Sequence, residues 1–162
     1  AVWPFATTQT LKALANFLTE YKQNKQIDRA VFYDKLHQYA RSHQKNGQPY
    51  IGEYQDEKTG YWLKGDNPRS SFYNHSGFSD LIINDLIGLK PTADNAIVIK
   101  PLVPQNLWDW FCLDNVSYHG HTLTIIWDKT GTKYGKGKGL QVFADGKRIA
   151  SSKKLSPLNV TL

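Results

Sequence analysis

The sequence has no methionine and a single cysteine, Cys112. One cysteine cannot form an internal disulfide, and it excludes any zinc site built from several thiolates. Cys112 lies in the apolar stretch Trp108-Asp-Trp-Phe-Cys-Leu113, which predicts a buried, unreactive thiol. Because the chain begins Ala1-Val2-Trp3-Pro4 without a methionine, we expect it to be processed or to be a piece of a longer protein.

Long hydrophobic runs and a signal-peptide pattern are also missing. The sequence therefore predicts no membrane-spanning segment and no membrane partner. With 162 residues, 40% hydrophobic and 21% charged, the chain can bury a core as one domain or two small ones. Aromatic residues make up 13% of it, which is high and argues against disorder.

The net charge of +6 raises the question of nucleic-acid binding. Much of the excess lies in the segments 129–138 and 147–154. The first is rich in glycine but lacks the spacing of a phosphate-binding loop, so it predicts a solvated, mobile loop and no nucleic-acid partner. His119-Gly-His121 could hold a cation, but no third ligand is near in sequence, so we expect neither a metal nor a cofactor.

The periodicity of the chain changes near Pro91, from helical to strand-like. Before it, apolar stripes predict helices at about 8–21, 29–44 and 76–89, with Thr7 or Thr8 capping the first, Asp28 capping the second and Asn46-Gly47 ending it. After it, short runs at 96–99, 113–118, 122–127, 140–144 and 147–150 predict antiparallel strands, with Asp145-Gly146 as a hairpin turn. The predicted class is α+β, with a helical segment at 1–90 and an antiparallel, sandwich-like β domain at 91–162.

Residues 47–72 show no clear periodicity and contain several glycines and aromatic residues. A structureless stretch of this length in a compact domain is usually functional or disordered, and its aromatic content favours an ordered, functional loop. Glu53 lies within it, between Gly52 and Tyr54. A carboxylate fixed among flat rings suits sugar cleavage, which needs a positioned acid or base and aromatic walls. A solvated surface glutamate is the alternative interpretation of the same residues.

Several segments together resemble a known group of enzymes. They are Trp3-Pro-Phe-Ala-Thr-Thr-Gln-Thr-Leu, Glu53-Tyr54 before Thr59-Gly60, Tyr73-Asn-His-Ser-Gly-Phe-Ser-Asp-Leu-Ile82, and the stretch from Leu89 through Lys100-Pro-Leu-Val-Pro104 into the strands. They are similar to the C-terminal part of (α/α)6-barrel glycoside hydrolases of the mannosylglycerate-hydrolase-like group, related to the mannosyl-oligosaccharide glucosidases. The resemblance implies that the N-terminal helices belong to an incomplete barrel and that a C-terminal β domain follows.

The resemblance also implies a mechanism and a set of site residues. Hydrolases of this kind use two carboxylates and invert the anomeric configuration, one carboxyl acting as general acid and the other as general base on water. Carried over by position, Glu53 is the base and Trp3 is a pocket residue. Tyr50, Trp62 and His75 are further candidates for substrate binding because they lie near these motifs. Should Glu53 be structural, the remaining carboxylates of the loop are Asp56, Glu57 and Asp66.

The general acid of such enzymes comes from an earlier part of the barrel, which no segment of this sequence resembles. We therefore expect a C-terminal fragment of an inverting glycoside hydrolase that acts on an oligosaccharide or small glycoside and is inactive when isolated. Its partners would be the carbohydrate substrate and the remainder of the same hydrolase chain. The alternative is a non-catalytic carbohydrate-binding or structural module. The resemblance favours a periplasmic or secreted location.

Overall fold

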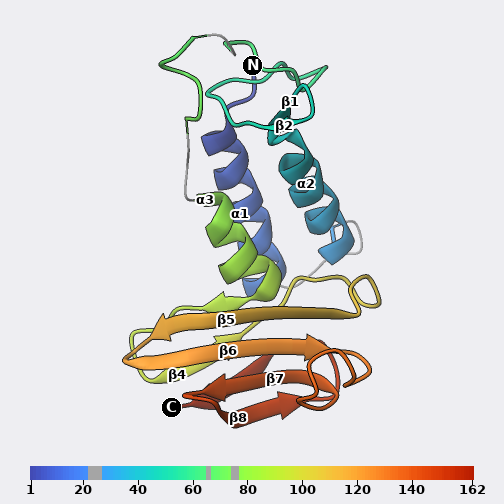
Figure 1. Ribbon diagram of the computed structural model, residues 1–162, viewed down its shortest axis with the longest axis vertical. Coiled ribbons are helices and arrows are strands. Elements are labelled where there is room, and N and C mark those ends of the chain that lie inside the picture. The colour runs from blue at the N-terminus through green and yellow to red at the C-terminus, as the bar shows by residue number, and fades with distance from the viewer. Residues whose placement is uncertain (22–26, 65–66, 74–76) are drawn as a thin grey trace. The chain divides into compact units, whose positions relative to one another are not determined.

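The computed structural model describes residues 1–21, 27–64, 67–73 and 77–162. Its chain divides into two compact units, Ala1–Leu81 and Ile82–Leu162 (Figure 1). In the described residues, three helices are followed by antiparallel sheets, so the expected order of helices and sheets is confirmed and the class is α+β. None of the described helices is long and apolar enough to cross a membrane.

Two helices form the frame of the first unit. Helix α1 (Pro4–Glu20) buries Leu11, Ala15 and Leu18, and helix α2 (Arg29–Ser42) buries Phe32, Leu36 and Tyr39. Burying a leucine or phenylalanine side chain stabilises the fold by roughly 1.5–3 kcal/mol. These are the apolar stripes that the sequence predicts, and they pack α1 against α2.

The start of α1 was predicted wrongly. The helix begins at Pro4, with Trp3 extended at the N-cap position, and not at Thr8. Proline suits the first helical position because its missing N–H has no intrahelical partner there in any case. Thr7 therefore lies inside the helix, and its hydroxyl donates to the Trp3 carbonyl at 3.3 Å. Trp3 is therefore the last extended residue before α1, and its carbonyl is bonded to the first turn of the helix.

The cap of α2 is confirmed, whereas its end lies earlier than predicted. The Asp28 carboxylate accepts the backbone N–H groups of Ala30 and Val31 at 2.9 and 3.0 Å. The helix ends at Ser42, and Asn46-Gly47 forms the turn of a small hairpin between β1 (Gln44–Lys45) and β2 (Gln48–Pro49). Both turn residues have positive φ, 53° and 75°, as a type I′ hairpin turn requires.

The third predicted helix is present with a change of winding. Its expected start at Ser76 lies outside the described residues. Helix α3 (Gly77–Asp80) passes into a π-helix, η1 (Leu81–Ile87), which closes with an i→i−5 bond of 3.1 Å from Gly88 N–H to the Ile83 carbonyl. A Cβ atom on Gly88 would lie 2.3 Å from the Lys100 carbonyl carbon, so this end of the helix requires glycine.

The second unit contains two antiparallel sheets. Strands β3 (Leu89–Lys90), β4 (Ala96–Ile99) and β9 (Leu158–Thr161) form one, in the order β3-β4-β9. Strands β5 (Trp110–Tyr118), β6 (His121–Asp128), β7 (Gly139–Ala144) and β8 (Lys147–Ser152) form the other, in that order. Every strand predicted after residue 91 is confirmed, and so is the turn at Asp145-Gly146 (φ 51° and 77°). The most deeply buried core residues of this unit are Ile97, Ile99, Val103, Leu123, Ile125, Leu140 and Val142.

Candidate functional site

The loop that carries Glu53 is ordered by backbone pairing in its described residues. Gln55 exchanges two backbone hydrogen bonds with Val2, of 2.7 and 2.8 Å, and also forms a bridge with Trp62. Gly52 pairs with Ser71 from the far end of the loop. These isolated bridges join segments that are far apart in sequence, and they bring the Trp3 segment and the Ser70 segment to the loop around Glu53.

Glu53 is half-buried and accepts a hydrogen bond from a buried hydroxyl. The Ser70 Oγ donates to its Oε2 at 2.9 Å, and the Ser70 residue is only 2% exposed. This bond is the main cause that lowers the pKa of Glu53, assisted by the Tyr54 hydroxyl and by the positive charges of Lys64 and Arg69, against a partial desolvation that raises it. These contacts favour the ionised form of the carboxylate.

Aromatic rings adjoin this carboxylate. The Trp3 indole stacks on Tyr54, with ring centroids 6.2 Å apart and an interplanar angle of 28°, and Trp3 is 37% exposed. Tyr54 hydrogen-bonds to Glu53 through its side chain, which raises the pKa of the phenol. Lys64 Nζ lies 4.5 Å from the centroid of the Tyr54 ring. Trp3 and Glu53 are thus linked through Tyr54, and the indole retains an exposed surface that could contact a ligand.

Trp62 and Tyr50 pack within the loop. Trp62 is 3% exposed, its Nε1–H donates to the Gln44 carbonyl at 2.9 Å, and its ring meets Tyr50 edge to face at 5.3 Å. Gly52 lies between them, since a Cβ atom there would be 3.0 Å from both rings. In this arrangement Trp62 supports the loop from inside, and Tyr50 is the more accessible of the two predicted wall residues.

The other carboxylates of the loop have different partners. The Asp56 Oδ1 accepts the N–H of Lys58 and both the N–H and the hydroxyl of Thr59 at 2.8–3.0 Å, which shapes the turn and lowers the Asp56 pKa. Glu57 lies 3.0 Å from the amine of Ala1. Asp66 and the predicted site residue His75 lie outside the described residues.

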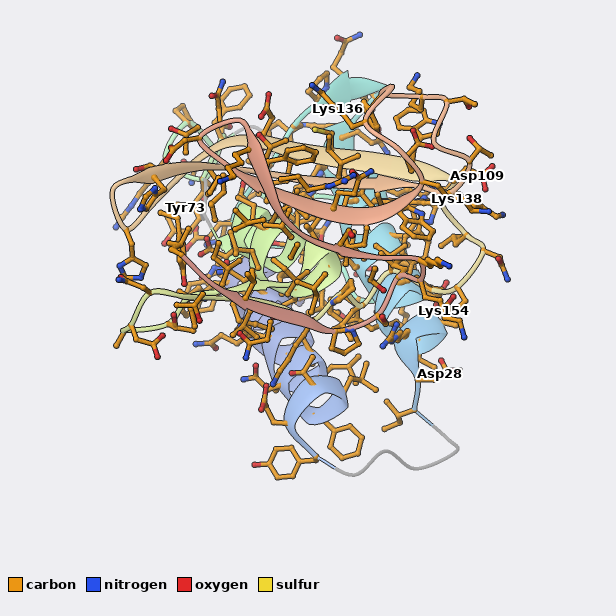
Figure 2. The ribbon with its side chains drawn as sticks, turned by 90° about the horizontal axis from the view of Figure 1, so that it is seen from below. Asp28, Tyr73, Asp109, Lys136, Lys138 and Lys154 are labelled. Carbon is orange, nitrogen blue, oxygen red and sulfur yellow. The ribbon has the colours of Figure 1, made fainter. Side chains whose placement is uncertain are left out.

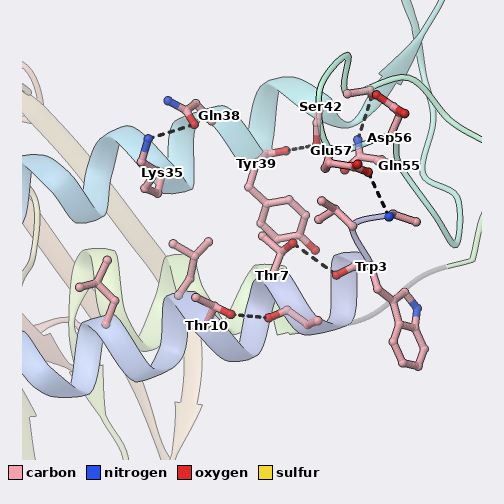
Figure 3. Close-up of a pocket in the computed structure, with 16 residues that line it drawn as sticks. Trp3, Thr7, Thr10, Lys35, Gln38, Tyr39, Ser42, Gln55, Asp56 and Glu57 are labelled. Carbon is pink, nitrogen blue, oxygen red and sulfur yellow. Dashed lines mark hydrogen bonds and ion pairs between the residues drawn. The ribbon is translucent and has the colours of Figure 1, made fainter.

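A hollow of about 550 Å³ lies between α1, α2 and this loop (Figure 3). Trp3, Tyr39, Gln55 and Asp56 are among the residues that line it, and Figure 3 shows the Trp3 indole at its edge. Glu53 is not one of the lining residues. The structure therefore joins Glu53 to Trp3 through Tyr54, which stacks on the indole and hydrogen-bonds to the carboxylate.

Ser70 and the role of Tyr54 were missed by sequence reasoning. Ser70 is 17 residues from Glu53, and no periodic pattern links the two positions. Tyr54 was noted only as a neighbouring aromatic residue. The one local signal is the turn Asn67-Pro-Arg-Ser, in which the Ser70 N–H donates to the Asn67 carbonyl at 2.9 Å. It predicts a turn at that point, but not what the hydroxyl of Ser70 contacts.

The interpretation of His119 and His121 as a metal site finds no support in the structure. The His119 Nε2 lies 3.0 Å from the Thr92 carbonyl oxygen, whereas the His121 Nδ1 lies 2.7 Å from the Asp145 carboxylate. The two rings thus have separate protein partners. Across the described ranges, no group of three histidine, cysteine, aspartate or glutamate side chains is placed to bind a metal ion.

The lysine-rich loop 129–138 is exposed over most of its length, as expected, and its first half is bonded to the core. The buried Asp128 carboxylate accepts four backbone N–H groups, those of Thr130, Gly131, Lys133 and Tyr134, at 2.7–3.2 Å. The expectation of a buried Cys112 was wrong. Cys112 is exposed, because alternation along β5 places Phe111 in the core and Cys112 on the opposite face. Its pKa is nevertheless raised, by partial burial and by the charge of Asp114, so the thiol is a poor nucleophile.

Two segments of the chain, one in each unit, match known protein families. Residues 1–76 match the family described as "Mannosylglycerate hydrolase MGH1-like glycoside hydrolase domain", and residues 89–150 match "Glycosyl hydrolase family 65, C-terminal domain". Both matched families are glycoside hydrolase families. The expected resemblance to the C-terminal portion of such an enzyme is therefore confirmed.

A solved structure named "Sialidase" is similar to this chain over 99% of its residues. The two sequences are 53% identical in the matched region, and the TM-score is 0.94. The match covers 15% of the sialidase chain, so this chain spans a small part of that protein's length. At 53% identity the two proteins share the fold of the matched region. The name "Sialidase" refers to a much longer protein.

Proposed function

We propose that this chain contributes the general base of an inverting glycoside hydrolase that acts on an oligosaccharide or small glycoside, and that Glu53 is this base. The observation that carries the proposal is the hydrogen bond from buried Ser70 to Glu53, within the segment that matches a glycoside hydrolase domain. A general base needs an ionised carboxylate in a fixed position, and this contact favours both.

The surroundings of Glu53 suit a carbohydrate. The exposed part of the Trp3 ring offers a flat surface for the C–H face of a pyranose, and Tyr50 is a further candidate for such a contact. His75 remains a candidate on sequence grounds alone. In our proposal the helices of the first unit belong to an (α/α)6 barrel completed by the remainder of the hydrolase chain, which also carries the general acid.

The test is Glu53→Gln in the longer hydrolase chain. Loss of a general base typically lowers kcat by about 10²–10⁴-fold, whereas sugar binding should persist because the amide has the shape of the carboxylate. Glu57→Gln is the control, since it alters a neighbouring exposed carboxylate. Proton NMR of the first-formed sugar should show inverted anomeric configuration. Unchanged turnover in Glu53→Gln would contradict the role of Glu53 as the base and would favour a non-catalytic binding or structural role for this chain.

The relative named as a sialidase raises one alternative for the chemistry. Sialidases use a tyrosine nucleophile, and Tyr54 is hydrogen-bonded to a carboxylate. That bond raises the pKa of Tyr54, so the phenol keeps its proton and acts as a donor to Glu53. We therefore favour Glu53 as the base and Tyr54 as its support.

The variant Tyr54→Phe separates these roles. If Glu53 is the base, the loss of one supporting hydrogen bond should reduce kcat by less than about tenfold, because Ser70 still holds the carboxylate. If Tyr54 is a nucleophile, the variant should lose turnover altogether, and the wild-type product should retain its configuration. Steady-state rates together with NMR of the product distinguish the two outcomes.

A further inference from the structure

The second unit carries an exposed aromatic hollow that the proposed chemistry at Glu53 does not involve. It measures about 540 Å³ and is lined by Leu107, Trp108, Asp109, Trp110, Phe111, Cys112 and Tyr134, which we call the Trp110 hollow. Trp110 begins strand β5, which is an edge strand of the four-stranded sheet, and it is 51% exposed. A tryptophan this exposed on a folded sheet is a candidate for ligand contact.

Two rings give the hollow its shape. The Trp110 and Tyr134 rings meet at 84° with centroids 6.4 Å apart, so they form two nearly perpendicular walls. Tyr134 belongs to the loop 129–138, where its own backbone N–H is bonded to the buried Asp128 carboxylate at 3.1 Å. Because Asp128 bonds this part of the loop, we expect the second wall to be in place without a ligand, which would lower the entropy lost on binding.

Positive charge surrounds these walls. Lys133 Nζ lies 4.2 Å from the centroid of the Trp110 ring, and Lys136 lines an adjoining hollow of about 280 Å³ that shares Tyr134 and Cys112 with the first. Nearby acidic groups are engaged, since Asp109 pairs with Lys129 at 2.9 Å and Asp114 accepts the Thr124 hydroxyl. Figure 2 labels Lys136 and Lys138 on this loop and Asp109 just before β5.

We propose that the Trp110 hollow is a binding site for an acidic glycan, a sugar chain that carries carboxylates. The apolar face of a pyranose would lie on the Trp110 ring, and the carboxylate of the sugar would be drawn to Lys133 and Lys136. The hollow belongs to the second unit and Glu53 to the first, and this proposal does not depend on the catalytic role proposed for Glu53.

Other occupants fit the surface less well. A protein partner would cover a patch poor in lysine, because lysine is depleted from protein interfaces, whereas lysine borders this one. A nucleic acid gains its affinity from many phosphate contacts, whereas two lysines, Lys133 and Lys136, lie at this hollow and its neighbour. A small aromatic corner with two ammonium groups matches one or two acidic sugar units.

The experiment is calorimetric titration of the longer hydrolase chain with trigalacturonate at low ionic strength. Trp110→Ala should weaken binding by about tenfold or more, and Trp110→Phe should weaken it less because a ring remains. The double variant Lys133→Ala/Lys136→Ala should weaken binding to a similar degree and remove most of its salt dependence. Lys154→Ala, at an exposed lysine outside the hollow, is the control and should bind normally.

The glycan-binding proposal and the proposed role of Glu53 can fail independently, and two variants separate them. Glu53→Gln should lower kcat by about 10²–10⁴-fold and leave trigalacturonate binding unchanged. Trp110→Ala should weaken trigalacturonate binding and leave kcat unchanged. Absent binding, or binding unaffected by Trp110→Ala, overturns the proposal. Equal affinity for a neutral galactose trimer, insensitive to the lysine variants, overturns its acidic specificity. Binding of single-stranded DNA through the same lysines without glycan binding would identify a different ligand. Circular dichroism of each variant checks that a loss of binding is not a loss of fold.

Discussion

Ser70, at the opposite end of the loop, influences the pKa and the orientation of the Glu53 side chain. Its hydroxyl is buried and donates to the carboxylate, so it lowers the pKa of Glu53 and restricts the orientation of its side chain. The two effects act differently on a general base. A fixed direction assists proton transfer, whereas a lower pKa makes the carboxylate a weaker base. A bound sugar that displaces water from Glu53 would raise this pKa again and restore basicity in the complex.

This balance predicts a shift in the pH profile of Ser70→Ala. Without the hydroxyl, the main cause that lowers the Glu53 pKa is gone, and the folded-state pKa rises. If Glu53 is the base, it works only when ionised, so the acid limb of kcat/KM should move to higher pH, and kcat should fall by up to about tenfold. The profile of the longer hydrolase chain measures both effects.

Ser71→Ala is the matched control for this prediction. The Ser71 hydroxyl donates to the Asn67 carbonyl at 3.1 Å, so its loss removes a comparable hydroxyl from the same turn. Its acid limb should stay where the wild-type limb lies. An acid limb that stays in place in Ser70→Ala, or moves to lower pH, would contradict the assignment of the limb to Glu53.

Individual elements show which features local sequence can predict. The Asp28 cap and the turn at Asp145-Gly146 were predictable because each depends on residues within a few positions of one another. Asn46-Gly47 carries a signal shared by helix ends and hairpins, and pairing of the flanking strands decides in favour of the hairpin. The contact between Ser70 and Glu53 depends on the path of a long loop, so no local pattern could reveal it.

The loop 129–138 shows the same limit at the scale of an element. Its glycines and lysines resemble a mobile segment, but Asp128, which precedes it, is buried and bonds four of its backbone N–H groups. Those bonds lower the pKa of Asp128 overall, although desolvation by burial opposes them. Anchoring by this carboxylate is therefore complete above the unfolded pKa of about 3.9 and is lost as the pH falls through the lower folded value.

Asp128→Asn should release this loop while the sheet remains folded. The amide places an NH₂ group where a carboxylate oxygen accepts two backbone N–H groups, so about half of the anchoring bonds are lost. Trypsin should then cut after Lys133, Lys136 or Lys138 on the order of tenfold faster at neutral pH. Mass spectrometry locates the cuts. Asp109→Asn, which removes only an exposed ion pair, should leave cleavage slow; equal rates in the two variants would mean that Asp128 does not anchor the loop.

At the scale of the whole molecule, the carboxyl groups agree with the half of the chemistry that we propose for this chain. An inverting hydrolase needs a general acid whose pKa is raised, so that it is protonated near neutral pH. Among the described residues, every carboxyl group with a clear shift has a lowered pKa: Glu53, Asp56, Glu57, Asp94, Asp128 and Asp145. These groups suit bases, turn anchors and ion pairs, and none of them suits the acid.

We therefore predict that the isolated 162-residue chain hydrolyses no glycoside above the background rate. The chain corresponds to 15% of the solved structure that it matches, and the acid would come from the rest of the hydrolase. The assay compares the isolated chain, its Glu53→Gln variant and the longer hydrolase chain on the same aryl glycosides, after circular dichroism has shown that the isolated chain is folded. Only the longer chain should turn over substrate. Hydrolysis by the isolated chain that Glu53→Gln abolishes would mean that both carboxyl groups lie within these residues, with Asp66, outside the described ranges, as a candidate for the acid.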